Sequence, residues 1–180
     1  MRHWFTLSAM GGDRPGLVAE LAQLIYDCGA NLEDSRMTIL GTDFAVILLC
    51  SSSDAEVGDR IAAGAKQLER DHGLTILQRS LEGGERPPIP APGTRLYRVE
   101  AVGEDRAGIV ASLCRVLADR GVNITELSTH SRPGPGGAPS YEFRVIAEVP
   151  DTADVPALRA SLEREGDRLV IDVALLPSTA

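Results

Sequence analysis

Two short stretches of this sequence combine glycine, aspartate and arginine in a way that suits a carboxylate-binding turn. The first is Gly12-Asp13-Arg14-Pro15-Gly16-Leu17, between an apolar run and a segment with helical periodicity. Gly11 and Gly12 permit a positive φ and a close backbone approach, and Pro15 suits the first helical position, where no N–H is required. The unpaired N–H groups of that first turn form a positively polarised pocket. The chemistry predicted here is recognition of a small carboxylate.

A polar residue follows the predicted helix at the start of the next strand. This is Asn31, preceded by Gly29, a residue type that often ends helices. An amino acid carries an ammonium group beside its carboxylate, and we expect that group to meet the side-chain oxygen of Asn31 or a backbone carbonyl. A purely structural turn that caps the helix is the alternative. The residue types alone leave both interpretations open.

The whole pattern occurs twice. Gly11-x-Asp13-Arg14-x-Gly16 returns as Gly103-x-Asp105-Arg106-x-Gly108, and Asn31 returns as Asn123, in each case 92 positions later. A repeat of fixed spacing indicates an internal duplication and takes precedence over local motifs. The second copy has Ala107 where the first has Pro15. It nevertheless predicts a second ligand site, formed by Asp105, Arg106, Gly108, Ile109 and Asn123.

The elements that must position these residues follow from hydrophobic periodicity. In the first half we expect strands at 3–9, 31–40, 44–50 and 74–81, with helices at 16–28 and from a cap at 51–54 to residue 72. In the second half we expect strands at 95–102, 123–132, 141–149 and 168–176, with helices at 108–120 and 154–165. Each order is β-α-β-β-α-β, which predicts an α+β fold of two ferredoxin-like βαββαβ domains in tandem.

The domain boundaries are indicated by one proline-rich segment. We expect a first domain at 1–82, a linker at 83–94 that contains Pro87-Pro88-Ile89-Pro90, and a second domain at 95–180. Such a segment cannot join a sheet and favours extended polyproline II geometry. It therefore predicts a semi-rigid spacer between the two domains.

The two predicted third strands differ in their patterning. Tyr141 to Val149 alternates apolar and charged residues, so one face meets the core and the other meets water. Phe44 to Leu49 is apolar on both faces. The outer face of the first sheet therefore needs a cover, which the other domain, a second chain or a partner protein could supply. Of these, we expect the second domain or a second copy of the chain.

Composition excludes several classes of function. The net charge of −8 opposes direct binding to nucleic acid and to anionic membranes. The longest apolar run is too short to cross a bilayer, and the N-terminus lacks the pattern of a signal peptide, so we expect a cytoplasmic protein. Three widely spaced cysteines, Cys28, Cys50 and Cys114, predict buried reduced thiols.

No catalytic constellation is visible in the sequence. His3, His72 and His130 are scattered, no serine lies in a nucleophile elbow, and no Cys/His cluster has zinc spacing. Gly11-Gly12 also lacks the Lys-Ser/Thr that a phosphate-binding loop requires. We therefore expect neither an enzyme, a metal site nor a cofactor.

The repeated motif resembles that of the ACT domain, a small-molecule-sensing βαββαβ module. Both halves carry Asp-Arg-x-Gly before the helix and Gly-x-Asn at the second strand. The first half is more specific: Gly11 to Gly16, Cys28 to Arg36, Leu40 to Phe44 and the linker Arg86 to Ala91 are similar to the glycine cleavage system transcriptional repressor family. The resemblance implies a tandem ACT regulator without a DNA-binding domain.

The same resemblance implies a mechanism. Such a protein would hold a transcription activator protein inactive by direct contact, and a small amino acid, glycine, would relieve the hold. An alternative is a free-standing regulatory subunit of an amino-acid or folate metabolic enzyme. The charged run Glu33-Asp34-Ser35-Arg36 is either a solvated edge with an internal ion pair or the partner-recognition surface. A homo-oligomer is a further expectation.

Overall fold

Alternating apolar residues form the strands of both sheets, and their buried side chains face the helices. The computed structural model describes residues 2–81, 89–133 and 139–178. The chain divides into two units, Met1–Arg86 and Pro87–Ala180. Part of the predicted linker, residues 83–88, lies outside the described residues.

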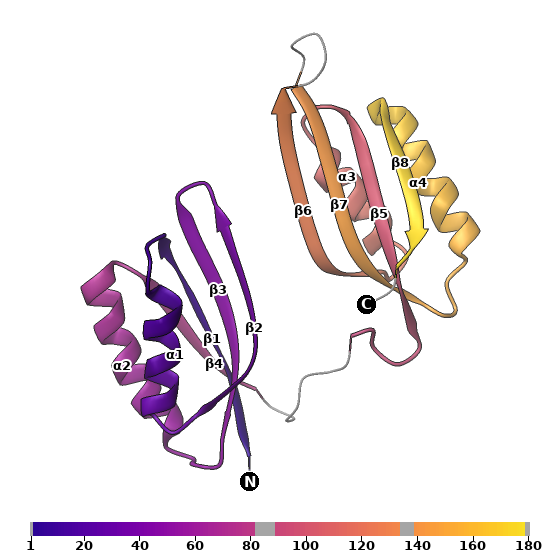
Figure 1. Cartoon of the computed structure of the whole chain (residues 1–180). Helices are drawn as coiled ribbons and strands as arrows, with labels where there is room; N and C mark the ends of the chain where they lie inside the picture. The colour runs from indigo at the N-terminus through magenta and orange to yellow at the C-terminus, as the bar shows by residue number, and fades with distance from the viewer. Residues whose placement is uncertain (1, 82–88, 134–138, 179–180) are drawn as a thin grey trace. The chain divides into compact units, whose positions relative to one another are not determined.

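The first unit has the predicted β-α-β-β-α-β order (Figure 1). Its elements are β1 (His3–Gly12), α1 (Leu17–Asp27), β2 (Asn31–Leu40), β3 (Asp43–Ser52), α2 (Val57–His72) and β4 (Thr75–Leu81). The strands form one antiparallel sheet in the order β2-β3-β1-β4, with α1 and α2 on one face. Between the two layers lies a core that includes Phe5, Leu7, Leu21, Phe44 and Ile61.

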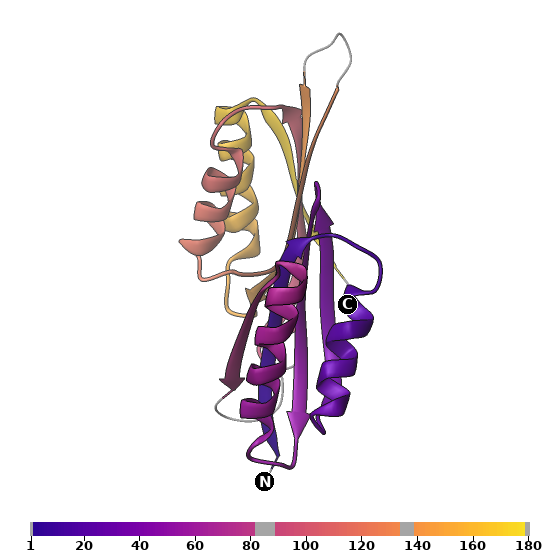
Figure 2. The ribbon, with the colours of Figure 1, turned by 90° about the vertical axis from the view of Figure 1, so that its left-hand side faces the viewer.

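The second unit repeats this arrangement. Its elements are β5 (Thr94–Glu104), α3 (Ile109–Ala118), β6 (Asn123–Pro133), β7 (Pro139–Pro150), α4 (Val155–Leu169) and β8 (Ile171–Pro177). The sheet order is β6-β7-β5-β8, again antiparallel. Figure 2 shows this sheet nearly edge-on, with α3 and α4 on one side of it. The predicted α+β, tandem ferredoxin-like fold is confirmed.

Several predicted element boundaries differ from the structure by a few residues, and two of the differences have a clear physical reason. Helix α4 runs to Leu169 instead of stopping at residue 165, because Leu158, Leu162, Gly166 and Leu169 form one continuous buried face. The helix ends at Val170, a non-glycine residue with a φ of 58°. The predicted cap at 51–54 is also displaced: β3 extends to Ser52, and Glu56 is the N-cap of α2. Asp54 still accepts the Glu56 N–H, at 2.9 Å.

Candidate functional site

The first candidate turn connects β1 to α1 and is centred on Gly16. This glycine is the N-cap of α1, with a left-handed φ of 99°. No side-chain hydrogen bond caps the helix in the described structure. The first intrahelical bond is donated by Glu20 N–H to the Gly16 carbonyl at 3.0 Å. The preceding N–H groups of the helix are therefore available to an anion.

The prediction for Pro15 is wrong in one respect. Helix α1 begins at Leu17, so Pro15 lies before the N-cap and not at the first helical position. The left-handed backbone of Gly16 separates the proline from the helix. Proline here fixes the approach of the chain to the turn instead of starting the helix.

The second turn, between β5 and α3, has the same backbone. Gly108 is the N-cap of α3 with a φ of 96°, and again no side chain in the described structure caps the helix. Asp105 donates its N–H to the Pro139 carbonyl at 3.0 Å, as Asp13 does to the Thr42 carbonyl at 3.0 Å. Each turn is thus tied to the hairpin between the second and third strands of its unit. The two copies share one geometry although Ala107 replaces Pro15.

The first glycine of each motif has a different role from the last. Neither Gly11 nor Gly12 has a positive φ, contrary to the freedom invoked for them. Gly11 and Gly103 instead allow close packing: a β-carbon on Gly11 would lie 2.8 Å from Leu74 Cδ2, and one on Gly103 would lie 2.5 Å from Ile171 Cγ2. These glycines hold β1 and β5 against the start of the last strand in their units.

Side chains around the first turn form a charged chain from α1 to α2. Arg14 donates to Glu20 Oε2 at 2.6 Å, and His72 Nε2 lies 2.9 Å from the same oxygen. The hydrogen bond from Arg14 is the main cause that lowers the pKa of the Glu20 carboxyl, with the charges of Arg14 and His72 adding to it. The sequence analysis missed both Glu20 and His72. An acidic residue in a first helical turn near an arginine is a local signal, but His72 gives none.

The second turn uses other partners. Arg106 pairs with Glu104 at 2.8 Å, and Asp105 accepts a hydrogen bond from Ser131 Oγ at 2.8 Å. Ser112 stands 92 positions after Glu20, so the acidic link to the second helix is replaced by a hydroxyl that accepts from Arg168 at 3.0 Å. The turns therefore share a backbone but differ in the charges beside it.

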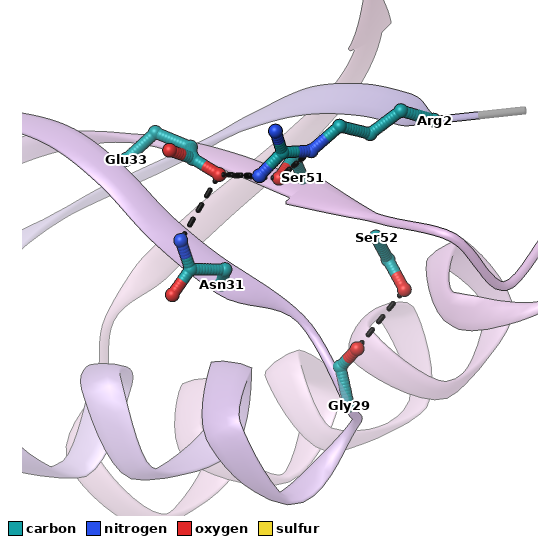
Figure 3. Close-up of polar contacts among 6 residues, drawn as sticks. All are labelled: Arg2, Gly29, Asn31, Glu33, Ser51 and Ser52. Atoms are coloured by element: carbon teal, nitrogen blue, oxygen red, sulfur yellow. Dashed lines mark hydrogen bonds and ion pairs between the residues drawn. The ribbon is translucent and has the colours of Figure 1, made fainter.

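Asn31 lies at the other end of α1 and is held by a polar cluster (Figure 3). Its Nδ2 donates to Glu33 Oε1 at 3.0 Å, and the same oxygen accepts from Ser51 and Arg2. The hydrogen bonds from Ser51 and then Asn31 are the main causes that lower the pKa of Glu33. In Figure 3 the amide oxygen of Asn31 points away from Glu33, so this oxygen remains an acceptor.

Asn123 has a different anchor from Asn31. Its Nδ2 donates to Glu148 Oε2 at 3.0 Å, and Glu148 also accepts the Ala91 N–H at 2.8 Å. The Glu148 side chain is buried, with 7% of the residue exposed. This carboxylate fixes the end of the linker segment to the second sheet. The sequence analysis missed it, because a glutamate on a strand does not reveal a partner 25 residues away.

The structure does not bring the turn and the asparagine of one unit together. Gly16 and Asn31 flank an 11-residue helix, α1, and such a helix is about 16 Å long. Gly108 and Asn123 are separated in the same way by α3. One small amino acid cannot contact both ends of a helix at once. Within a unit, the carboxylate and ammonium contacts predicted for one ligand therefore do not form a single pocket.

The charged run on β2 divides between two faces. Glu33 belongs to the cluster around Asn31, and the register shifts between Leu32 and Asp34. Beyond the shift, Ser35 pairs with Leu48, whose side chain is buried on the helix side. Asp34 and Arg36 pair with Leu49 and Ile47 on the opposite face. The ion pair of Glu33 is made with Arg2 and not within the run.

Among the described residues there is no group of three or more His, Cys, Asp or Glu side chains that could hold a metal ion. None of the described helices is long and apolar enough to cross a membrane. In the described structure the three cysteines are free; Cys28 and Cys50 are buried, and Cys114 is partly exposed.

Two segments of this chain, residues 3–77 and residues 97–167, each match the ACT domain. The chain is 29% identical over 155 residues to the glycine cleavage system transcriptional repressor of Escherichia coli, which covers 85% of this chain and 78% of that protein. A solved structure of an unknown protein from Galdieria sulphuraria is 30% identical, with a TM-score of 0.84 over 99% of this chain and 100% of that one.

Proposed function

Because this chain belongs to the ACT domain family, with one such domain in each half, we propose that it is an amino-acid-responsive regulator that controls a transcription activator by protein contact. A regulatory role agrees with the similarity to the Escherichia coli repressor. In this proposal a small amino acid, glycine first, binds at the turns before α1 and α3. The regulated activator is that of the glycine cleavage system, and the protein itself does not bind DNA.

The observation that carries the ligand proposal is the repeated uncapped helix start. At both Gly16 and Gly108 a left-handed glycine exposes backbone N–H groups without a capping side chain from the described residues. Helix α2 also lacks a side-chain cap, but its N-cap Glu56 has an ordinary right-handed backbone. In α4, Asp154 is the cap and accepts the Ala157 N–H at 3.0 Å. A ligand carboxylate would take the place of such a cap at α1 and α3. The predicted ligand residues Gly12 to Leu17 surround the first position, and Asp105, Arg106, Gly108 and Ile109 surround the second.

The ammonium group of the ligand needs a separate partner. Since Asn31 and Asn123 lie at the far ends of their helices, the acceptors within a unit are those of the turn itself, namely its backbone carbonyls and, in the first unit, the nearby Glu20 carboxylate. Asn31 can take part only beside a turn that belongs to another unit, for example the turn of a second copy of the chain. In that arrangement the ligand bridges two copies, and its differential affinity for two arrangements of the contact is the switch.

The ligand proposal is tested by calorimetric titration of the full chain with glycine and the other small amino acids. Gly16→Ala places a β-carbon in a left-handed backbone, at a cost of about 1–2 kcal/mol, and should weaken binding at the first site. Gly29→Ala is the matched control, because Gly29 has a φ of 75° at the opposite end of α1. Equal binding constants for the two variants would place the ligand elsewhere.

The partner proposal needs the purified activator. We expect the full chain and the activator to elute together in gel filtration, and the complex to separate when glycine is added. A complex with an amino-acid or folate enzyme instead would favour the alternative of a regulatory subunit. The proposal that the protein does not bind DNA rests on the net charge of −8. Specific DNA binding by the pure chain at physiological salt would contradict it.

A further inference from the structure

The face of the first sheet that lies opposite α1 and α2, called the open face here, carries exposed apolar side chains. They are Met10 on β1, Ile47 on β3 and Leu77 on β4, with 56%, 54% and 67% of each residue exposed. Ser8 lies between Ile47 and Leu77 in register, and Met10, two residues further along the same face of β1, is a diagonal neighbour of both. Contiguous exposed apolar side chains of this kind mark an interaction site.

Two arginines flank the apolar residues, one at each edge of the sheet. Arg36 on β2 pairs in register with Ile47, and Arg79 on β4 follows Leu77 by two residues on the same face. Both are exposed, and neither makes an ion pair within the part of the chain that the structure describes. Two acidic residues share this face: Asp34, on β2 beside Leu49, whose side chain accepts the Ser35 N–H, and Asp43 at the start of β3.

The second sheet also has an open face, opposite α3 and α4, but charged residues occupy the equivalent positions there. Arg144 replaces Ile47, Glu100 replaces Ser8, and the two are ion-paired at 3.3 Å. Arg98 also pairs with Glu100, at 3.0 Å, and Arg132 pairs with Glu142 at 3.5 Å. A hollow of about 360 Å³ on that face is lined in part by Glu100, Arg132, Glu142 and Arg144. The duplication has thus produced one face that neutralises its own arginines and one face that does not.

The spacing of the sheet fits a helix between the two arginines. Neighbouring strands lie about 4.8 Å apart, so the edge strands β2 and β4 are separated by about 14 Å. A helix with its side chains is about 10–12 Å wide. A helix lying over Ile47 and Leu77 would therefore have one flank near Arg36 and the other near Arg79. A second copy of this face would present the same two arginines, whereas an acidic helix offers a carboxylate to each of them.

We propose that the open face of the first sheet binds an acidic amphipathic helix of a partner protein. The apolar stripe of that helix covers Met10, Ile47 and Leu77, and carboxylates on its two flanks pair with Arg36 and Arg79. This rests on the proposed function only in that a protein partner exists. Of the covers that the sequence left open, the charges favour a partner protein over a second copy of the chain.

The test uses the full chain with a photoreactive benzoylphenylalanine at position 77, expressed in the source cells and irradiated. The expected product is an adduct with another protein, and mass spectrometry should place the cross-link in a helical peptide with acidic residues on both sides of apolar ones. Replacing both arginines, Arg36→Glu with Arg79→Glu, should reduce the yield about tenfold or more, because like charges then face the helix. The same amino acid at position 102, on the second open face, is the matched control and should give little adduct.

Three results would overturn the proposal: an adduct between two copies of this chain, no adduct above the level at position 102, or a yield that charge reversal leaves unchanged. Because both arginines are exposed, charge reversal should leave the protein folded. An unchanged melting temperature of the double variant checks this. An acidic helix from a protein other than a transcription activator would support the docking site and contradict the proposed function. The two proposals therefore fail separately.

Discussion

At the scale of single residues, the glycines and charges of the two turns have separable roles. Gly16 and Gly108 supply the left-handed backbone of the turns, whereas the sequence led us to expect that conformation at Gly11 and Gly12. The link from Arg14 through Glu20 to His72 was not predictable, because it joins residues from α1 and α2 that only the fold brings together. In the first unit, Glu20 therefore links the turn to the second helix, whereas in the second unit Ser112 stands at the position of this acidic residue.

The lowered pKa of Glu20 predicts a pH-dependent contribution to stability. A carboxyl whose pKa is lower in the folded chain stabilises the fold above its ordinary value of 4.5, and this contribution disappears as the pH falls through the folded pKa. Glu20→Gln should therefore lower the melting temperature at pH 7, and the difference from the natural chain should vanish at strongly acidic pH. Thermal melts at several pH values measure this. A constant difference across that range would contradict the coupling.

The cysteines predict an order of reactivity. Burial raises the pKa of the Cys50 thiol to about 12, with the charge of Glu33 adding to the shift. At pH 8 only about one molecule in ten thousand would then carry the reactive thiolate. Cys114 is partly exposed and should react first with a thiol reagent in the native protein, and Cys50 should react only on unfolding. Mass spectrometry of the labelled peptides checks this order, with Cys114→Ser as the control.

At the scale of elements, periodicity predicted the type and order of every helix and strand, but not all of their ends. The C-terminus of α4 shows why. Gly166 lies inside the helix and not after it, because its missing side chain lets α4 contact β8. A single sequence shows a glycine near the end of a helical pattern, and this suggests a terminus. Whether that glycine ends a helix or allows close packing depends on the strand that lies against it.

The same contact predicts opposite effects for two helical glycines. Gly166→Ala gains up to about 1 kcal/mol of helix propensity, but its β-carbon would lie 2.7 Å from Val173 Cγ2 and 2.9 Å from the Ile171 carbonyl oxygen. Overpacking of this kind costs about 1–3 kcal/mol, so the variant should be less stable. Gly58→Ala in α2 meets only the flexible end of Gln78, at 3.1 Å, and should be neutral or stabilising. Urea unfolding of both variants measures the difference, and a stabilised Gly166→Ala would refute the packing argument.

At the scale of the whole molecule, the duplication carried most of what could be predicted. The constant offset of 92 predicted two domains of one fold and two equivalent turns, and the structure repeats both. The separation of each turn from the asparagine of its unit was predictable only from topology, since a βαβ connection places the residues before and after a helix at its opposite ends. The contrast between Ile47 and Arg144 could be seen in the sequence, but the arginine pairing in each sheet could not.

Each half of the chain should fold without the other. Each unit has its own four-stranded sheet, and no sheet includes strands of both units among the described residues. Each unit also has its own core, one centred on Leu7, Phe44 and Ile61 and the other on Val99, Phe143 and Leu158. Domains of this length retain only several kcal/mol of net stability. Each isolated half should therefore unfold cooperatively, with a melting temperature in the ordinary mesophilic range of about 45–65 °C. Residues 1–82 and 94–180, expressed separately, should each give a single sigmoidal transition in circular dichroism. A first half that is unfolded alone, although the second half folds, would show that its core depends on the rest of the chain.

The first half alone keeps its open face, on which Arg36 and Arg79 are exposed. Charge repulsion between copies should weaken as salt rises. Sedimentation should therefore show more self-association of residues 1–82 at high salt than at low salt, while residues 94–180 respond little.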